Sequence, residues 1–255
     1  MQFEHVIIEK LRNVAKLVIN RPERLNAMSE KTRYEIIGAL KKIESERTIK
    51  SLIITGAGNR AFSAGQDLEE SKEFSSRKAK EWVRQWGELY RQVLRFPHPI
   101  VTATPGYAVG AGWQLYLLGD YRVASQKAKF GMTEIDIGIP CITGSAILES
   151  MIGLAEVSRL TLMAEMLGAN EAKKLGLVHK VVPISHLKAA TMDAARRLAV
   201  KPPTAIKLQK IWLNGLLWER LRKGVAQAKL SHSQAFASGE PRKYMTGFLN
   251  KRGKT

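Results

Sequence analysis

The sequence predicts an α/β core followed by a helical C-terminal region. Short apolar runs typical of strands alternate with helix-like segments up to about residue 182. From Ile184 onward the pattern is helical, with breaks at Pro202-Pro203 and Pro241. Two of the expected strands lead through glycine-rich turns into helices. We therefore expect a core over residues 1–190 and a helical region over residues 191–255.

Each expected element follows from local sequence. Residues 5–10 and 15–20 alternate around Arg12-Asn13, which predicts a hairpin, and Ser29 is suited to cap an amphipathic helix whose apolar residues lie between 34 and 43. The remaining expected strands are 51–55, 100–104, 121–124, 129–131 and 178–182. The remaining expected helices before residue 184 are 69–95, 110–118 (a turn, then a helix), 145–151 and 155–163.

Composition excludes several classes of protein. The chain has 255 residues, 45% hydrophobic and 25% charged, which is ordinary for a globular protein with one large core. Cys141 is the single cysteine, which rules out a disulfide scaffold, and the five histidines show no ligand spacing, so we expect no metal site. The first ten residues, MQFEHVIIEK, lack the apolar core of a signal peptide. We therefore expect a cytoplasmic protein.

Residues 96–119 contain no Lys, Arg, Asp or Glu, so this stretch is long enough to span a bilayer. Within it, Gly106 and Gly110 form a GxxxG pair, which is typical of packed membrane helices. Pro97, Pro99 and Pro105 argue against a spanning helix. They favour a buried strand, a turn and the start of a helix, and we expect no membrane association.

Basic residues predominate, giving a formal net charge of +18. Residues 201–255 contain twelve Lys or Arg and two acidic residues, Glu219 and Glu240, and so account for +10 of it. Such a surface attracts nucleic acid, anionic lipid or a small ligand with several phosphates. It is equally the solvated face of C-terminal helices. No RNP, zinc-finger or helix-turn-helix signature is present, so nucleic acid is not the expected partner.

Two loops share a design suited to binding an oxygen that gains negative charge. Residues 55–68 (TGAGNRAFSAGQDL) and 106–115 (GYAVGAGWQL) each run from a strand through small residues into a helix. Small residues let a ligand approach the backbone, and a helix start offers unpaired N–H groups. Two such loops can supply two donors to one oxygen. Tight packing also selects glycine, so a purely structural role remains open.

A third segment, residues 130–140 (FGMTEIDIGIP), places Glu134 in apolar surroundings after a short strand. Burial raises the pKa of a carboxyl group and suits it to general acid–base catalysis near neutral pH. The alternative is an exposed loop glutamate.

Several segments together resemble the enoyl-CoA hydratase/isomerase family, which has the crotonase fold. The matching segments are RPERLNAM (21–28), AFSAGQDL (61–68), GYAVGAGWQL (106–115), FGMTEIDIGIP (130–140), AKKLGLVHKVV (172–182) and GFLNKR (247–252). The resemblance implies a spiral of β-β-α units with a C-terminal trimerisation region, and a homotrimer or dimer of trimers. It also implies an acyl-CoA thioester substrate, with coenzyme A as part of the substrate and no separate cofactor.

The resemblance also assigns site residues. The thioester oxygen would be held by the backbone N–H groups of Gln66 and Ala111. Glu134 would be the catalytic acid–base, and Gln114 lies at a second catalytic position. Residues at the CoA and substrate site would be Arg24, Leu25, Ala27, Ala61, Ser63, Ala64, Asp67, Leu68, Gly110, Phe248 and Lys251, the last two from this chain or a neighbouring subunit. CoA phosphates would give the basic C-terminal region a partial use.

The sequence departs from the hydratase pattern at Gln114, where such enzymes carry a second glutamate. An amide cannot exchange a proton at pH 7. Moving a proton within an allylic system needs one carboxylate, so Gln114 favours double-bond isomerisation over hydration by Glu134. Ile142 stands near the position of the aspartate used in dehalogenase-type relatives, which argues against that chemistry. Asp136 is interpreted as structural, and acyl-CoA decarboxylation remains open.

Other readings use different residues. Ser63 lies in a near match to a G-x-S-x-G elbow, with His179 as a possible partner, which would indicate a hydrolase. Cys141 is a nucleophile or a small buried hydrophobe. A basic RNA-binding protein is a further alternative. Gly56 and Gly58 lack the third glycine and the spacing of a dinucleotide site. Trp113 and the pair Trp82 and Trp86 either line an acyl pocket or pack in the core.

Overall fold

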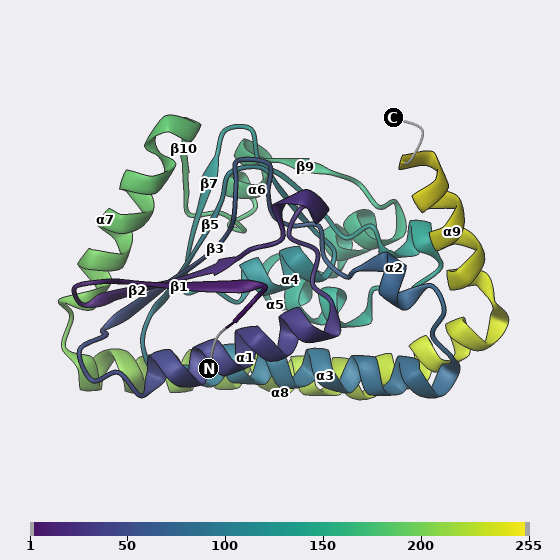
Figure 1. Cartoon of the computed structure of the whole chain (residues 1–255), viewed down its shortest axis with the longest axis horizontal. Helices are drawn as coiled ribbons and strands as arrows, with labels where there is room; N and C mark the ends of the chain where they lie inside the picture. Colours follow the sequence, from purple (N-terminus) through teal and green to yellow (C-terminus); the bar gives the residue numbers. More distant parts are fainter. Residues whose placement is uncertain (1–2, 253–255) are drawn as a thin grey trace.

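The computed structural model describes residues 3–252 and contains two sheets (Figure 1). The larger has the order β1 (Val6–Leu11), β2 (Val14–Ile19), β3 (Ser51–Gly56), β5 (Ile100–Thr104), β7 (Tyr121–Ser125) and β10 (Lys180–Val182), all neighbours parallel except the β1–β2 hairpin. The smaller has the order β4 (Ala61–Ser63), β6 (Tyr107–Val109), β8 (Lys129–Gly131) and β9 (Leu167–Gly168).

Successive strands step from the large sheet to the small one, and the chain then forms a helix. β3 leads into β4 and then α2 (Leu68–Ser71) and α3 (Ser76–Arg95). β5 leads into β6 and α4 (Ala111–Leu117), and β7 leads into β8 and, through the short 3-10 helix η2 (Glu134–Ile137), into α5 (Ile142–Leu162). Because both sheets keep this order, the three units form a spiral of β-β-α turns, which confirms the predicted fold class.

The alternation of side chains along the strands separates two cores. In β3, Leu52 and Ile54 pack into the main cluster with α1 (Glu30–Glu44) and α3, whereas Ile53 packs on the opposite face. There it contacts the cluster that includes Ala190 and Ala194 of α7 (Leu187–Ala199). The boundary expected at residue 190 therefore falls inside a helix that covers the large sheet.

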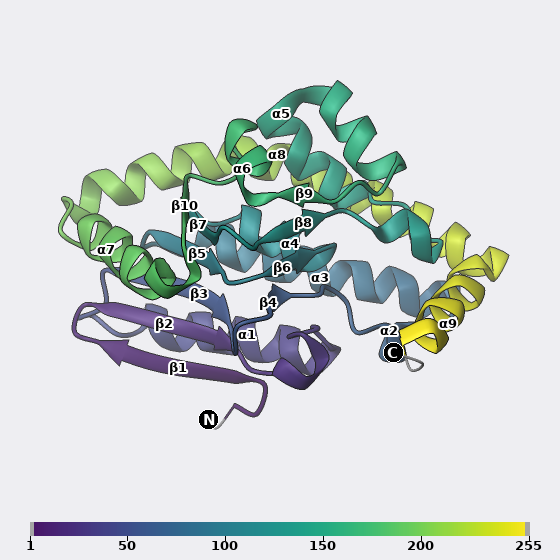
Figure 2. The same ribbon diagram turned by 90° about the horizontal axis from the view of Figure 1, so that it is seen from above.

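The long helix α8 (Pro203–Ser238) runs along α3 and α5, as Figure 1 shows for α3. The last helix, α9 (Glu240–Arg252), turns back beside α2 and η2 (Figure 2). The remaining elements are α6 (Ala169–Lys174) and the 3-10 helices η1 (Pro22–Arg24) and η3 (Ile184–His186). The C-terminal region thus brings residues near 248 to the ends of the spiral loops.

Some expected elements differ in detail. The helix predicted over 69–95 is two helices, because Asp67 caps α2 and Ser75 caps α3. The helices predicted at 145–151 and 155–163 form one element, α5, whose backbone departs from helical geometry at Gly153 (φ +78°). The break expected at Pro241 occurs at Gly239, which ends α8 with φ +78°.

Residues 96–119 fold as β5, β6 and α4 rather than as one helix. None of the helices formed within residues 3–252 has the length and apolar character needed to cross a membrane. The spanning alternative for this stretch is therefore excluded by its own secondary structure.

Candidate active site

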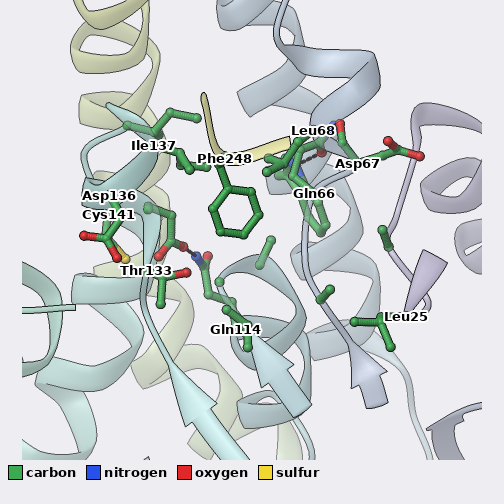
Figure 3. A pocket seen from close by; sticks show the side chains of 18 of the residues that line it. Leu25, Gln66, Asp67, Leu68, Gln114, Thr133, Asp136, Ile137, Cys141 and Phe248 are labelled. Carbon is green, nitrogen blue, oxygen red and sulfur yellow. Dashed lines mark hydrogen bonds between the residues drawn. The ribbon is translucent and has the colours of Figure 1, made fainter. Parts of the chain in front are cut away.

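A pocket of about 920 Å³ opens where the spiral loops, α3 and α9 meet (Figure 3). Figure 3 shows the Phe248 ring projecting into it, with Gln66 on one side and Thr133 and Cys141 on the other. The following residues predicted for the site line this one pocket: Arg24, Leu25, Ala27, Ala64, Gln66, Asp67, Leu68, Gly110, Ala111, Gln114, Glu134 and Phe248.

Three residues assigned to the site by resemblance lie elsewhere. Ala61 and Ser63 are fully buried in β4 and are not among the described residues that line the pocket. The Ser63 hydroxyl donates to the Asn26 carbonyl and accepts from the Gly65 N–H, so it supports the loop from behind. Lys251 is an exposed residue of α9 outside the pocket lining. Phe248 lines the pocket of its own chain.

The two glycine-rich loops touch each other at Gly65. This residue has φ +91°, and a Cβ added to it would lie 2.7 Å from the Val109 carbonyl oxygen and 3.3 Å from the Ala111 nitrogen. Ala111 begins α4, where the N–H has no partner within the helix. Within residues 3–252, the backbone N–H groups of Gln66 and Ala111 have no hydrogen-bond acceptor. Two free donors from different loops therefore border the same pocket.

The side chain of Gln66 is fixed by hydrogen bonds on both ends. Its Oε1 accepts from Arg33 at 2.8 Å, Trp82 at 2.8 Å and Trp86 at 3.3 Å. Its Nε2 donates to the Asp67 carbonyl and to Glu70. Because both ends of the amide are used, the side chain of Gln66 is held in one orientation.

Arg33 is the buried cation behind this arrangement, with 1% of its surface exposed. It also donates to the Met28 carbonyl and to Gln85, and its guanidinium lies 5.1 Å from the Trp86 ring centroid. Burial lowers the pKa of this guanidinium, while Glu70, 3.7 Å away, acts in the opposite direction. Arg33 thus joins α1 to α3 and to the Gln66 loop.

Glu134 lies at the start of η2 with its carboxyl group buried. Its Oε1 accepts a hydrogen bond from Gln114 Nε2 at 2.8 Å. The oxygen of the same amide accepts from the Tyr90 and Thr143 hydroxyls, each at 2.8 Å, which fixes the amide with its NH₂ toward Glu134. Within the described part of the chain, Glu134 Oε2 has no hydrogen-bond partner. One carboxylate oxygen is therefore held and the other is free.

Burial raises the pKa of Glu134 above its ordinary value of 4.5, with smaller opposing effects from its own backbone, Cys141 and Gln114. An acid whose pKa is higher in the folded state stabilises the fold below the unfolded-state pKa, and this contribution is lost as the pH rises through the folded-state pKa. Relative to wild type, Glu134→Gln should therefore gain in free energy of unfolding as the pH rises from about 4.5. Urea denaturation at several pH values measures this difference, and a difference independent of pH would contradict it.

The family model described as enoyl-CoA hydratase/isomerase matches residues 9–255 of this chain. The chain belongs to the enoyl-CoA hydratase/isomerase family.

Members of this family match nearly end to end. The short-chain-enoyl-CoA hydratase of Clostridium acetobutylicum is 31% identical over 253 residues, covering 99% of this chain and 97% of the relative. The 1,2-epoxyphenylacetyl-CoA isomerase of Escherichia coli K12 is 32% identical over 254 residues, covering 98% and 97%. A crystal structure of an enoyl-CoA hydratase from Mycobacterium avium subsp. paratuberculosis K-10 superposes with a TM-score of 0.87 at 25% identity, covering 96% of this chain and 99% of that one. The fold is the crotonase fold of this family.

The two alternative nucleophiles, Ser63 with His179 as its partner and Cys141, are poorly suited to catalysis in this structure. His179 stacks on Tyr121, and burial together with Arg122 lowers the pKa of His179 to about 4. It is not among the described pocket residues, so Ser63 and His179 do not share a site there. Cys141 does line the pocket, but burial and the adjacent Glu134 carboxylate raise the pKa of its thiol. A protonated thiol is a weak nucleophile.

Asp136 also lines the pocket, but it is exposed, whereas Glu134 is partly buried. The two residues lie in a 3-10 helix rather than a strand, so a spacing of two does not place them on one face. Within residues 3–252, no group of three His, Cys, Asp or Glu side chains is arranged to hold a metal ion.

Sequence reasoning missed several pocket residues. Tyr90 and Thr143 orient Gln114, but their hydroxyls carry no local sequence signal. Arg60 and Tyr107 are exposed residues that line the pocket, as is Arg24. Trp82 and Trp86 line the pocket, whereas Trp113 is completely buried against Phe130. Arg60 did carry a sequence signal, because it is a cation within the first glycine-rich loop, residues 55–68.

Proposed function

We propose that this protein moves the double bond of an enoyl-CoA thioester, with Glu134 as the single base that takes a proton from one carbon and returns it to another. The observation that carries the proposal is the state of the Glu134 carboxyl group. One oxygen accepts from Gln114, and the other is buried beside the pocket without a hydrogen-bond partner among the described residues. A raised pKa makes this carboxylate a stronger base.

In the proposed reaction the thioester oxygen accepts hydrogen bonds from the Gln66 and Ala111 N–H groups. Glu134 removes a proton from the γ-carbon of a 2-enoyl group, or from the α-carbon of a 3-enoyl group. The electron pair of the broken C–H bond moves through the conjugated carbons to the oxygen and forms a dienolate. The protonated Glu134 then returns the proton to the other end of the system, so that no atom is gained or lost. Oxyanion donors of this kind are typically worth about 3–4 kcal/mol each in the transition state.

Hydration by Glu134 is the second candidate, because the relatives include enzymes named short-chain-enoyl-CoA hydratase and crotonyl-CoA hydratase at 31% identity. Hydration needs one group to activate water and another to deliver a proton. Gln114 supplies an amide that is fixed by Tyr90 and Thr143 and cannot exchange a proton. This favours isomerisation over hydration.

The outer part of the pocket suits the rest of coenzyme A. Arg24 and Arg60 are exposed at the mouth and form no ion pair with other described residues, which suits the phosphates. The Phe248 ring of α9 projects into the same pocket (Figure 3). The reaction as written requires no cofactor besides the CoA carried by the substrate.

We further infer a cytoplasmic enzyme that assembles as a homotrimer or dimer of trimers. Exposed apolar side chains along the first half of α8 support assembly with further copies, since a monomer rarely leaves such a stripe uncovered. They are Leu208, Ile211, Trp212, Leu213 and Leu216, each at least half exposed.

Wild-type protein is expected to convert a 3-enoyl-CoA to the 2-enoyl isomer faster than it hydrates crotonyl-CoA. Gln114→Glu should shift this ratio toward hydration, because it restores a second carboxyl group opposite Glu134. Chromatography with mass detection separates an isomer of unchanged mass from a product heavier by one water.

The control is Gln209→Glu, the same change at an exposed site on α8, which should leave the ratio unchanged. Faster hydration than isomerisation by the wild type would favour the second candidate. If neither the isomer nor the hydrated product forms, both candidate functions are refuted.

A further inference from the structure

The inner end of the pocket is formed by one face of α3. Trp82, Trp86 and Tyr90 follow one another at intervals of four residues and therefore lie on the same side of the helix. Each is at most 4% exposed, and each lines the pocket. We refer to these three residues as the aromatic wall.

The rings of the aromatic wall are held in place by their polar edges. The Trp82 and Trp86 indole N–H groups donate to Gln66 Oε1, and the Tyr90 hydroxyl donates to Gln114 Oε1. The Trp86 and Tyr90 ring centroids are 5.6 Å apart with an interplanar angle of 32°. The wall is thus a preformed surface of aromatic faces and edges rather than an adaptable set of aliphatic side chains.

Two rings of α8 pack against the wall at Trp82. The His232 ring lies 5.3 Å from that of Trp82, and the Phe236 ring lies 6.1 Å from it. Ile139 and Pro140 line the same pocket. We call the part of the pocket that is lined by the aromatic wall, Ile139 and Pro140 the inner chamber; its aromatic surfaces are held rigidly.

We propose that this chamber selects an acyl group that carries a planar ring close to the thioester, in preference to a straight alkyl chain. This inference rests on the proposed function, since it assumes that the thioester carbonyl lies at Gln66 and Ala111. From there a ring on the acyl group reaches the aromatic wall, where it packs face to edge or in an offset stack. Such a ring pair gains up to about tenfold in affinity beyond the area it buries. A chain of equal carbon number must instead give up its rotational freedom.

The test is the affinity of CoA thioesters that carry no reactive double bond, measured by calorimetry. Benzoyl-CoA and phenylacetyl-CoA should bind about tenfold more tightly than heptanoyl-CoA and octanoyl-CoA, which match them in carbon number. Straight-chain thioesters that bind equally well or better would overturn the ring preference alone. If no thioester binds more tightly than free CoA, the proposed function fails as well.

Variants separate the ring from its hydrogen bond. Trp86→Leu should abolish the tenfold preference, whereas Trp86→Phe, which keeps a ring but loses the N–H, should retain most of it. Trp218→Leu is the matched control, because Trp218 lies on α8 outside this pocket. A preference that survives in Trp86→Leu would show that the aromatic wall is not its source.

Discussion

Replacing Glu134 by Gln is expected to lower the rate of double-bond migration by about two to four orders of magnitude, the range typical of a general acid–base. The substituted amide keeps the shape of the side chain but cannot take up a proton. Since the aromatic wall, Arg24 and the free N–H groups of Gln66 and Ala111 are untouched, the affinity for a saturated CoA thioester should persist. Turnover and calorimetric affinity, measured on the same preparation, separate the two effects.

Asp136→Asn is the matched control for this experiment. Asp136 lies two residues further along, borders the same pocket and is exposed, so the same chemical change there should leave turnover nearly unchanged. If Glu134→Gln retained full turnover, or if Asp136→Asn lost as much, the assignment of the base to Glu134 would be wrong.

Replacing Gly65 by Ala is expected to lower kcat by about two to three orders of magnitude, the cost of losing one oxyanion donor. The added Cβ would lie 2.7 Å from the Val109 carbonyl oxygen and 3.3 Å from the Ala111 nitrogen, so the two loops must separate. In addition, a residue with a side chain at φ +91° costs about 1–3 kcal/mol in free energy of unfolding. Steady-state kinetics and urea denaturation report the two consequences.

Gly176→Ala is the control that separates the effect of loop contact on kcat from the effect of backbone strain on stability. Gly176 has a similar positive φ of +76°, but a Cβ added there meets no atom within 4 Å. It should lose a comparable part of its stability through backbone strain and keep its kcat. Equal losses of kcat in both variants would mean that contact between the loops at Gly65 has no special part in catalysis.

The frame of the fold could be predicted because most strands of the large sheet are short apolar runs, as expected for strands buried on both faces. Ile53 alternates with Leu52 and Ile54, and the two sets pack on opposite faces. The strands β4, β6 and β9 escaped prediction because two or three residues are too few to show an alternation. Of the small sheet only β8 was predicted, so the pairing of these strands became visible only in three dimensions.

The site was predictable where chemistry and backbone requirements coincide. Gly65 and Gly110 mark the two loops, and Glu134 follows a short strand, so these residues could be singled out from sequence and family resemblance. The aromatic wall could not, because Trp82 and Trp86 have the same helical spacing whether they face a pocket or a core. Likewise, nothing local indicates that Arg33, far away in the sequence, donates to Gln66.

The amide oxygen of Gln66 accepts hydrogen bonds from Trp82, Trp86 and Arg33 at once. The backbone of the same residue supplies one of the two donors that border the pocket beside Gly65. In the proposed reaction, recognition of the acyl group and activation of its carbonyl thereby depend on one residue. Evolution toward a differently shaped substrate by changing these tryptophans would disturb the electrophilic centre too, so new specificity in this enzyme should arise together with compensating changes around residue 66.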